Sequence, residues 1–147
     1  NPGGLLSAAV ESADLFLNQG VIVSTKSRSE GDQQFQALPS LEFQNLKVGI
    51  LINDRSASAA EVFTAALKEH GRAWVMGEKS YGKGVVQKLF PLSNGAALQM
   101  TVSHYYTPSG RMIEGVGIAP NQVYPMPHEL KDESYVEHVA EILINRR

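Results

Sequence analysis

The sequence predicts a single α/β domain, and the order of its hydrophobic segments carries that prediction. Short apolar runs of strand length alternate with segments in which apolar residues recur at helical spacing, the order expected when helices connect the strands of a sheet. The chain has 147 residues, 43% of them hydrophobic, which is enough for one core of ordinary domain size. Because there is no internal repeat or low-complexity tract, we expect residues 1–147 to form one unit.

Charge and cysteine content exclude several classes of function. Thirteen Lys and Arg against fifteen Asp and Glu give a net charge of -2, so the chain lacks the basic field typical of proteins that bind nucleic acid or anionic membranes. The absence of cysteine excludes disulfides, Cys-ligated zinc, iron–sulfur clusters and a thiolate nucleophile. No apolar run approaches the roughly 18 residues that span a bilayer. The sequence therefore gives no reason to expect a metal or cofactor.

The first part of the chain predicts a turn, a helix, a strand and a loop. Asn-Pro-Gly-Gly at residues 1–4 is a dense turn signal. Apolar residues at i, i+3, i+4, i+7 and i+11 predict an amphipathic helix over residues 6–17. Residues 21–23 favour a short strand, and the polar, aperiodic residues 27–40 favour an exposed loop or flap. Since the chain starts in a turn, without Met or an apolar signal core, we expect it to be part of a larger protein.

The middle of the chain predicts a strand–helix–strand unit. Residues 48–52 are almost continuously apolar, as in a strand covered on both faces. Residues 59–69 keep the helical period more clearly than any other segment, and His70-Gly71 supplies a stop signal. Residues 73–76 read as a second buried strand.

The last part predicts a hairpin and a terminal helix. An Asn-Gly turn lies between the alternating segments 85–89 and 97–106, which is typical of a β-hairpin. Apolar spacing predicts a C-terminal helix over residues 134–145.

Ser58 is the first candidate for a nucleophile. It lies at the predicted start of the helix over residues 59–69, where unpaired backbone N–H groups and the positive end of the helix dipole favour developing negative charge. Small neighbours would let a substrate backbone approach closely. Ser58 and Glu61 also have capping-box spacing, and a serine in that setting is usually structural. The spacing alone does not decide between Ser58 and Ser56.

A lysine is the better candidate for the base. The four histidines have no local carboxylate partner, although a Ser-His-Asp triad is not excluded, because its members meet in space. Lys83 lies between two glycines and precedes two valines, so its surroundings are tight and can be dry. Burial lowers the pKa of an ammonium group and favours the neutral amine that a base requires. Lys79, flanked by Glu78 and Ser80, reads as more solvated, and a solvated or anion-binding loop lysine is also the ordinary interpretation of Lys83.

Gln87 follows Lys83 by four residues, which in an extended segment places both side chains on one face. Its carboxamide could hold the amine without adding charge. The ordinary alternative is a half-exposed strand glutamine.

Five segments then occur in an order and spacing typical of one enzyme family. They are Asn-Pro-Gly-Gly at 1–4, Ser-Ala-Ser-Ala-Ala-Glu at 56–61, Gly-Glu-Lys-Ser-Tyr-Gly-Lys-Gly-Val-Val-Gln at 77–87, Tyr-Thr-Pro-Ser-Gly at 106–110 and Gly-Val-Gly-Ile-Ala-Pro at 115–120. Over about 120 residues the sequence resembles the C-terminal processing peptidases, also called tail-specific proteases.

The resemblance implies a serine endopeptidase with a Ser-Lys dyad and an acyl-enzyme intermediate. By analogy, Ser58 is the nucleophile and Lys83 the general base, 25 residues apart, and Gln87 orients Lys83. The oxyanion hole would use the backbone N–H groups of Ala59 and of Gly3 or Gly4. Some members carry an acidic residue where Glu69 stands, but Gln87 fits the supporting position better.

The resemblance also implies the fold, the partners and the location. The fold would be the ββα spiral of crotonases and Clp-type peptidases, truncated on its N-terminal side. Substrates would be proteins or peptides with an apolar C-terminal tail, captured by a PDZ domain that is absent from residues 1–147. The location would be extracytoplasmic: bacterial periplasm, cell envelope or thylakoid lumen. Association into a homo-oligomer is left open.

Two further interpretations belong to other functional classes. One is a non-catalytic module that binds a hydrophobic ligand or peptide, because the retinoid-binding repeats of the vertebrate eye are similar to these peptidases. The other is a crotonase-like acyl-CoA enzyme, for which the chain has glycine-rich turns but no obvious basic site for the adenine phosphates.

Overall fold

A computed structural model of the chain describes residues 1–27, 31–39, 43–125 and 133–145. Three helices and seven strands follow one another along these residues. They are α1 (Leu6–Asp14), β1 (Val21–Ser27), β2 (Gln33–Gln36), β3 (Val48–Ile52), α2 (Ala59–Glu69), β4 (Ala73–Gly77), β5 (Val85–Pro91), β6 (Ala97–Tyr106), β7 (Gln122–Val123) and α3 (Glu133–Ile144).

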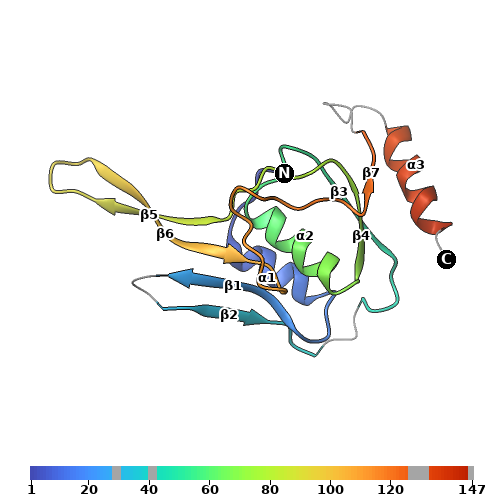
Figure 1. The fold of residues 1–147 in the computed structure, drawn as a ribbon, viewed down its shortest axis with the longest axis horizontal. Helices are drawn as coiled ribbons and strands as arrows, with labels where there is room; N and C mark the ends of the chain where they lie inside the picture. The colour runs from blue at the N-terminus through green and yellow to red at the C-terminus, as the bar shows by residue number, and fades with distance from the viewer. Residues whose placement is uncertain (28–30, 40–42, 126–132, 146–147) are drawn as a thin grey trace.

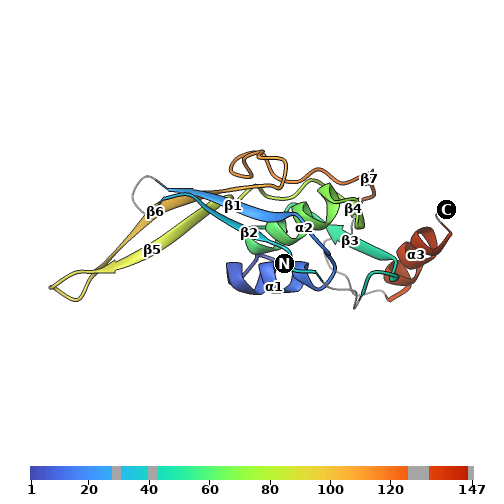
Figure 2. The same ribbon diagram turned by 90° about the horizontal axis from the view of Figure 1, so that it is seen from below.

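The strands form two sheets. One has four antiparallel strands in the order β2-β1-β6-β5, and the other has three parallel strands in the order β3-β4-β7. The β5–β6 hairpin extends away from the body at one end of the molecule, and α3 lies at the opposite end (Figures 1 and 2). The mixture of helices with parallel and antiparallel strands confirms the predicted α/β class.

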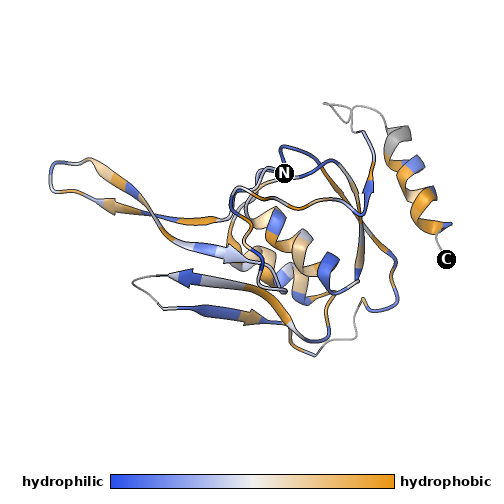
Figure 3. Cartoon of the chain, in the orientation of Figure 1, coloured by the Kyte–Doolittle hydropathy of each residue, from blue (hydrophilic) through white to orange (hydrophobic). Residues whose placement is uncertain are grey.

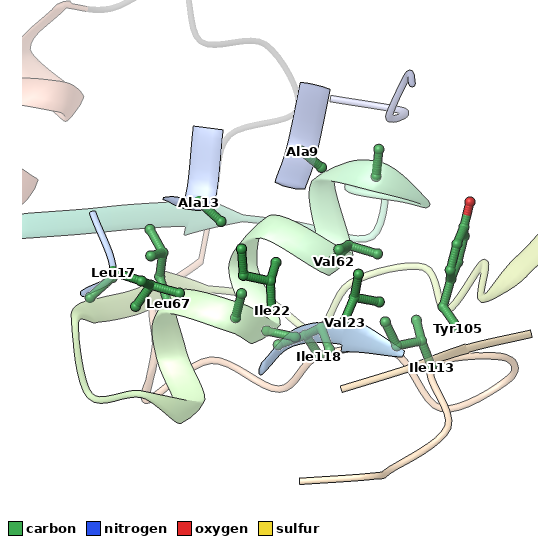
Figure 4. Packing of buried hydrophobic residues seen from close by; sticks show 14 of the residues in the cluster. Ala9, Ala13, Leu17, Ile22, Val23, Val62, Leu67, Tyr105, Ile113 and Ile118 are labelled. Carbon is green, nitrogen blue, oxygen red and sulfur yellow. The ribbon is translucent and has the colours of Figure 1, made fainter. Parts of the chain in front are cut away.

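The core forms around α2, which packs against α1, β1 and β4. Alanines on α1 and α2, including Ala13 and Ala66, are fully buried and let the two helices approach closely. Larger side chains from β1 and from the segment after β6, such as Ile22, Val23 and Ile113, fill the remaining space (Figure 4). This packing fixes the N-terminal end of α2, where the candidate nucleophile lies.

Most predicted elements are confirmed. Strand β3 and helix α2 have the predicted bounds, the hairpin forms, and α3 begins one residue before the predicted start. Helix α1 ends at Asp14, earlier than expected. The apolar period continues beyond it because Leu17, in the following turn, still packs into the core.

The predicted loop over residues 27–40 is corrected in part. Residues 28–30 and 40 lie outside the described residues, but Gln33–Gln36 form strand β2, which pairs with β1. Strand β2 is at the edge of its sheet, where three of its four residues are exposed and only Phe35 packs against the core. A strand that buries one side chain has no hydrophobic alternation, so its sequence resembles a loop.

The outer part of the hairpin is exposed on both faces. From Gln87 to Thr101 every residue is exposed, including the apolar Leu89 and Leu98. Figure 3 shows hydrophobic stretches along this hairpin. Among the described residues, none of the helices has the length and hydropathy needed to cross a bilayer.

Candidate active site

Ser58 lies at the sharp turn between β3 and α2. Its φ is 57°, and among the described residues it is the one non-glycine residue with positive φ. An L-residue in this region is strained, and such strain persists only where the surrounding structure enforces it. The turn is held by hydrogen bonds from Ser56 N–H to the Asn53 carbonyl at 2.9 Å and from Ala57 N–H to the Asn1 carbonyl at 3.0 Å.

The glycine turn at the start of the chain lies directly against Ser58. A Cβ added to Gly3 would lie 2.8 Å from Ser58 Cβ and 2.6 Å from the Ala57 carbonyl oxygen, so only glycine fits there. Gly3 N–H donates to Asn1 Oδ1 at 2.9 Å, whereas a Cβ on Gly4 would meet open space. Ala59 is the first residue of α2, and the N–H groups of a first turn have no partner within their helix.

Lys83 lies in a loop whose backbone is tightly packed. Cβ atoms on Gly82 and Gly84 would collide with backbone atoms of residues 113–117, and Gly84 N–H donates to Glu114 Oε2 at 2.6 Å. The Lys83 side chain itself is exposed. The dry surroundings expected for a lysine base are therefore not present around its amine, because the glycines pack the backbone and leave the side chain in an open groove.

Lys83 and Gln87 share that groove, which has a volume of about 860 Å³. The two side chains lie on the same side, as predicted, but regular strand alternation is not the reason, because β5 begins at Val85 and a bulge interrupts it between Val86 and Gln87. Gln87 Oε1 accepts a hydrogen bond from Gln99 Nε2 at 2.8 Å. The other lining residues are Pro2, Asp54, Arg55, Ala57, Ser80, Tyr81, Val85 and Glu114.

A second cavity, of about 400 Å³, lies at the other side of the Ser58 turn. Ala57 lines the groove with Lys83, whereas Ala59 lines this second cavity. Its remaining walls come from the glycine turn, α1, β3 and α2 and are mostly apolar. They include Gly3, Gly4, Leu5, Ala8, Ile50, Ile52, Ala60 and Phe63.

Glu61 is a site residue that the sequence analysis treated only as half of a capping box. Its side chain is 1% exposed. Oε2 accepts hydrogen bonds from the N–H groups of Ser58 and Lys83, both at 2.8 Å. Oε1 accepts from Ser80 Oγ at 2.5 Å and Gly82 N–H at 2.7 Å. The sequence signals only the cap, because the other donors to Glu61 come from the loop at residues 80–83.

The other predicted candidates do not line the groove with Lys83, although Ser56 lines the second cavity. Ser56 is buried, and its Oγ accepts from Asn53 N–H at 3.1 Å, which is a role within the turn. Lys79 is exposed and does not line the groove. None of the three described histidines lines it, and His70 Nε2 is 2.7 Å from the Val21 carbonyl oxygen; His128 lies outside the described residues.

Glu69 is at the far end of α2 from Ser58. It pairs with Arg111 at 2.5 Å and accepts from Ser109 N–H at 2.8 Å. Burial alone would raise the pKa of Glu69, but hydrogen bonds from Arg111, Ser109 and Thr107 outweigh it and hold the pKa below its usual value. The described residues contain no cluster of three side chains that could hold a metal ion.

Comparison with known proteins identifies the family. The model of peptidase family S41 matches residues 1–124. The chain belongs to peptidase family S41. This match and the relatives below confirm the resemblance to the C-terminal processing peptidases that the five sequence segments indicate.

Several relatives of this S41 chain are proteases by name. The carboxy-terminal-processing protease of Bartonella bacilliformis is 44% identical over 136 residues, covering 92% of this chain and 31% of the relative. The carboxyl-terminal-processing protease of a Picosynechococcus strain is 41% identical over 125 residues, covering 85% of this chain and 30% of the relative. The chain thus spans about a third of the length of the relatives it matches.

Solved structures agree with the fold. The photosystem II D1 C-terminal processing protease superposes with a TM-score of 0.80 at 31% identity, over 97% of this chain and 36% of that one. An S41 protease from Bacteroides fragilis superposes with a TM-score of 0.76 at 18% identity, over 98% of this chain and 42% of that one. The second likeness concerns the fold alone.

Proposed function

We propose that this S41 chain carries the catalytic residues of a serine endopeptidase that cleaves polypeptides at or near their C-termini. The observation that supports this most is the conformation of Ser58. A strained serine at the start of α2, packed against a glycine turn, supports this role; its neighbour Ala57 lines the groove with Lys83, whereas Ser58 itself lines neither cavity.

In the proposed mechanism, Ser58 Oγ attacks the carbonyl carbon of the scissile peptide bond and its proton passes to Lys83 Nζ. The backbone N–H groups of Ala59 and Gly4 stabilise the oxyanion; Gly4 is favoured over Gly3 because Gly3 N–H is already bonded to Asn1. Lys83 then gives its proton to the leaving amine. A water activated by the same amine hydrolyses the acyl-enzyme.

The exposed Lys83 side chain gives the substrate a part in this mechanism. A peptide bound in the groove displaces water from around the amine, and desolvation favours the neutral form that acts as base. Gln87 orients the amine, which requires its carboxamide to bond to Lys83 in addition to, or in place of, Gln99. The apolar cavity beside Ala59 accommodates an apolar side chain of the substrate.

The names of the relatives support the substrate class and the setting. Because several are named for C-terminal processing, we propose protein substrates with apolar C-terminal tails, a substrate-capturing PDZ domain elsewhere in the protein, and an extracytoplasmic location. We also propose that the fold is a ββα spiral, which the β3–α2–β4 unit supports.

Two substitutions in the full-length protein test the dyad. Ser58→Ala and Lys83→Ala are each expected to lower kcat for a peptide with an apolar tail by at least about 1,000-fold, with unfolding transitions like that of the wild type. Near-native turnover by Lys83→Ala would show that another group is the base.

A binding module of the same fold is the second candidate. It is favoured by two observations, the exposed Lys83 side chain and the engagement of Gln87 with Gln99. Labelling with a fluorophosphonate separates the two functions. A peptidase is expected to be labelled at Ser58 with time, whereas a binding module would bind a hydrophobic ligand saturably and stay unlabelled.

A further inference from the structure

We propose that Glu61 is a positioning residue that fixes the nucleophile and the base relative to one another through their backbones. This inference rests on the proposed function, because it assigns Ser58 and Lys83 to the dyad. A single oxygen, Glu61 Oε2, accepts from the N–H groups of both residues at 2.8 Å. Two residues that are distant in sequence therefore share one acceptor.

The second carboxylate oxygen holds the same loop. Glu61 Oε1 accepts from Gly82 N–H, next to Lys83, and from Ser80 Oγ. Ser80 Oγ in turn accepts from Ile118 N–H at 2.6 Å. The loop that carries Lys83 is thus attached to the N-terminal end of α2 at three points, all on one side chain.

A capping role does not account for this arrangement. A capping box involves only Ser58 and Glu61, through bonds between each side chain and the backbone N–H of the other. Glu61 is instead fully buried, with three further donors from residues 80–83. Burying a carboxylate is costly unless hydrogen bonds compensate for the lost water, so the donors and the carboxylate depend on one another.

The hydrogen bonds require an acceptor at both oxygens of the side chain. Three of its four partners are backbone N–H groups, which can only donate. A carboxylate accepts at both oxygens, whereas an amide presents an NH₂ group at one position and would face an N–H donor there. The positive end of the α2 dipole favours the negative charge at this position.

The hydrogen bond to Glu61 also helps to explain how Ser58 keeps its strained conformation. Ser58 keeps a φ of 57° while its N–H points to Glu61. The hydrogen bond to a charged acceptor offsets the cost of that conformation. Loss of the acceptor is expected to let Ser58 relax toward ordinary helix-start geometry, which changes the position of its hydroxyl.

The test is Glu61→Gln in the full-length protein. We expect kcat per folded molecule to fall by about 100-fold, the effect of misplacing a reacting group by about 1 Å. KM should change by less than about threefold, because neither cavity loses a lining residue. The rate of Ser58 labelling by a fluorophosphonate should fall in parallel with kcat.

Thr107→Val is the matched control for stability. Thr107 is also buried, and its Oγ1 is bonded to Ser109 Oγ and to Arg111 N–H. It lines neither cavity. This variant is expected to unfold at lower temperature while keeping its kcat and labelling rate per folded molecule.

Glu61→Asp is the second variant, for the case in which Glu61→Gln does not fold. It keeps the buried charge and two acceptor oxygens, but the shorter side chain cannot reach both Ser58 N–H and Lys83 N–H. We expect a folded protein with kcat lowered at least about tenfold. A folded Gln or Asp variant with wild-type kcat and labelling rate would overturn the proposal.

Ser58→Ala and Lys83→Ala, assayed alongside the Glu61 variants, distinguish failure of the proposed function from failure of the positioning role of Glu61. If Ser58→Ala or Lys83→Ala retains activity, the proposed function itself fails. If both are inactive while the Glu61 variants turn over like the wild type, the dyad stands and only the positioning role fails.

Discussion

Gly3→Ala tests whether the glycine turn holds Ser58 in its working position. Gly3 has a φ of +98°, and an added Cβ would lie 2.6 Å from the Ala57 carbonyl oxygen and 2.8 Å from Ser58 Cβ. The Ala57 oxygen is a backbone atom, so it cannot move aside as the end of a flexible side chain can. The added methyl group must therefore displace the turn that carries Ser58, the proposed nucleophile.

The size of the effect follows from these distances. Ordinary van der Waals contact begins at 3.4 Å, so the contact with the Ala57 oxygen must open by about 0.8 Å. A misplacement of about 1 Å at a reacting group lowers rates by about 100-fold. We expect kcat to fall by roughly 10-fold to 100-fold. The left-handed backbone adds about 1–2 kcal/mol of strain, which lowers the free energy of unfolding.

The assay compares Gly3→Ala with Gly71→Ala in the full-length protein. Gly71 also has positive φ, at +66°, but its added Cβ meets nothing within 4 Å. It therefore carries backbone strain without a collision, and we expect a similar loss of stability in urea with an unchanged kcat. Equal kcat values for the two variants would refute the reasoning, since the contact with the Ser58 turn would then have no catalytic consequence.

Three other substitutions test the supporting structure. Gly84→Ala places a Cβ 2.2 Å from Glu114 N, so we expect the Lys83 loop to open, lowering the melting temperature measured by circular dichroism and abolishing cleavage; native values would exclude the close approach. Glu69→Gln is expected to lower the urea midpoint. Because the folded-state pKa of Glu69 is lowered from 4.5, the wild type should exceed the variant in stability by the full amount above about pH 5, and this difference should disappear as the pH falls through the lowered pKa. A pH-independent difference would contradict that pKa. Leu67→Ala removes a fully buried core side chain (Figure 4) and should lower the free energy of unfolding by about 2–5 kcal/mol; a loss under about 1 kcal/mol would indicate that the core at α2 repacks.

The fold was predictable where an element's own residues determine its burial. The period of α2 reflects a face that is buried along most of the helix, and its bounds agree with the sequence. The bounds of β3 also agree, although only Ile52 is buried and Gly49 is exposed, so the strand is not covered on both faces. Strand β2 was not predictable, because its pairing with β1 is made by backbone groups that any sequence has. Phe35 is the one residue of β2 that packs against the core, and a single apolar side chain defines no period in the sequence.

The candidate site divides in the same way. Ser58, Lys83 and Gln87 stand out through neighbours in the sequence, namely alanines, glycines and valines. The role of Glu61 depends on the loop at residues 80–83 folding back onto α2. That contact crosses about twenty residues of chain and leaves no local pattern, so the sequence suggests a cap and the structure adds three donors.

In the proposed mechanism, the buried Glu61 carboxylate holds the backbone of Lys83 in place, while the Lys83 side chain stays exposed and supplies the amine. Hydrogen bonds to buried Glu61 fix the backbone of Lys83, so the position of the base does not depend on its own side chain being packed. The amine can then remain in water until a peptide fills the groove, because only its solvation has to change and not its anchoring. A dyad built in this way would be held in register before substrate arrives, and the bound peptide would then remove water from around the amine. On this reasoning a peptide that fills the groove should accelerate fluorophosphonate labelling of Ser58 if it leaves the hydroxyl accessible, and the same peptide should not accelerate labelling of Lys83→Ala.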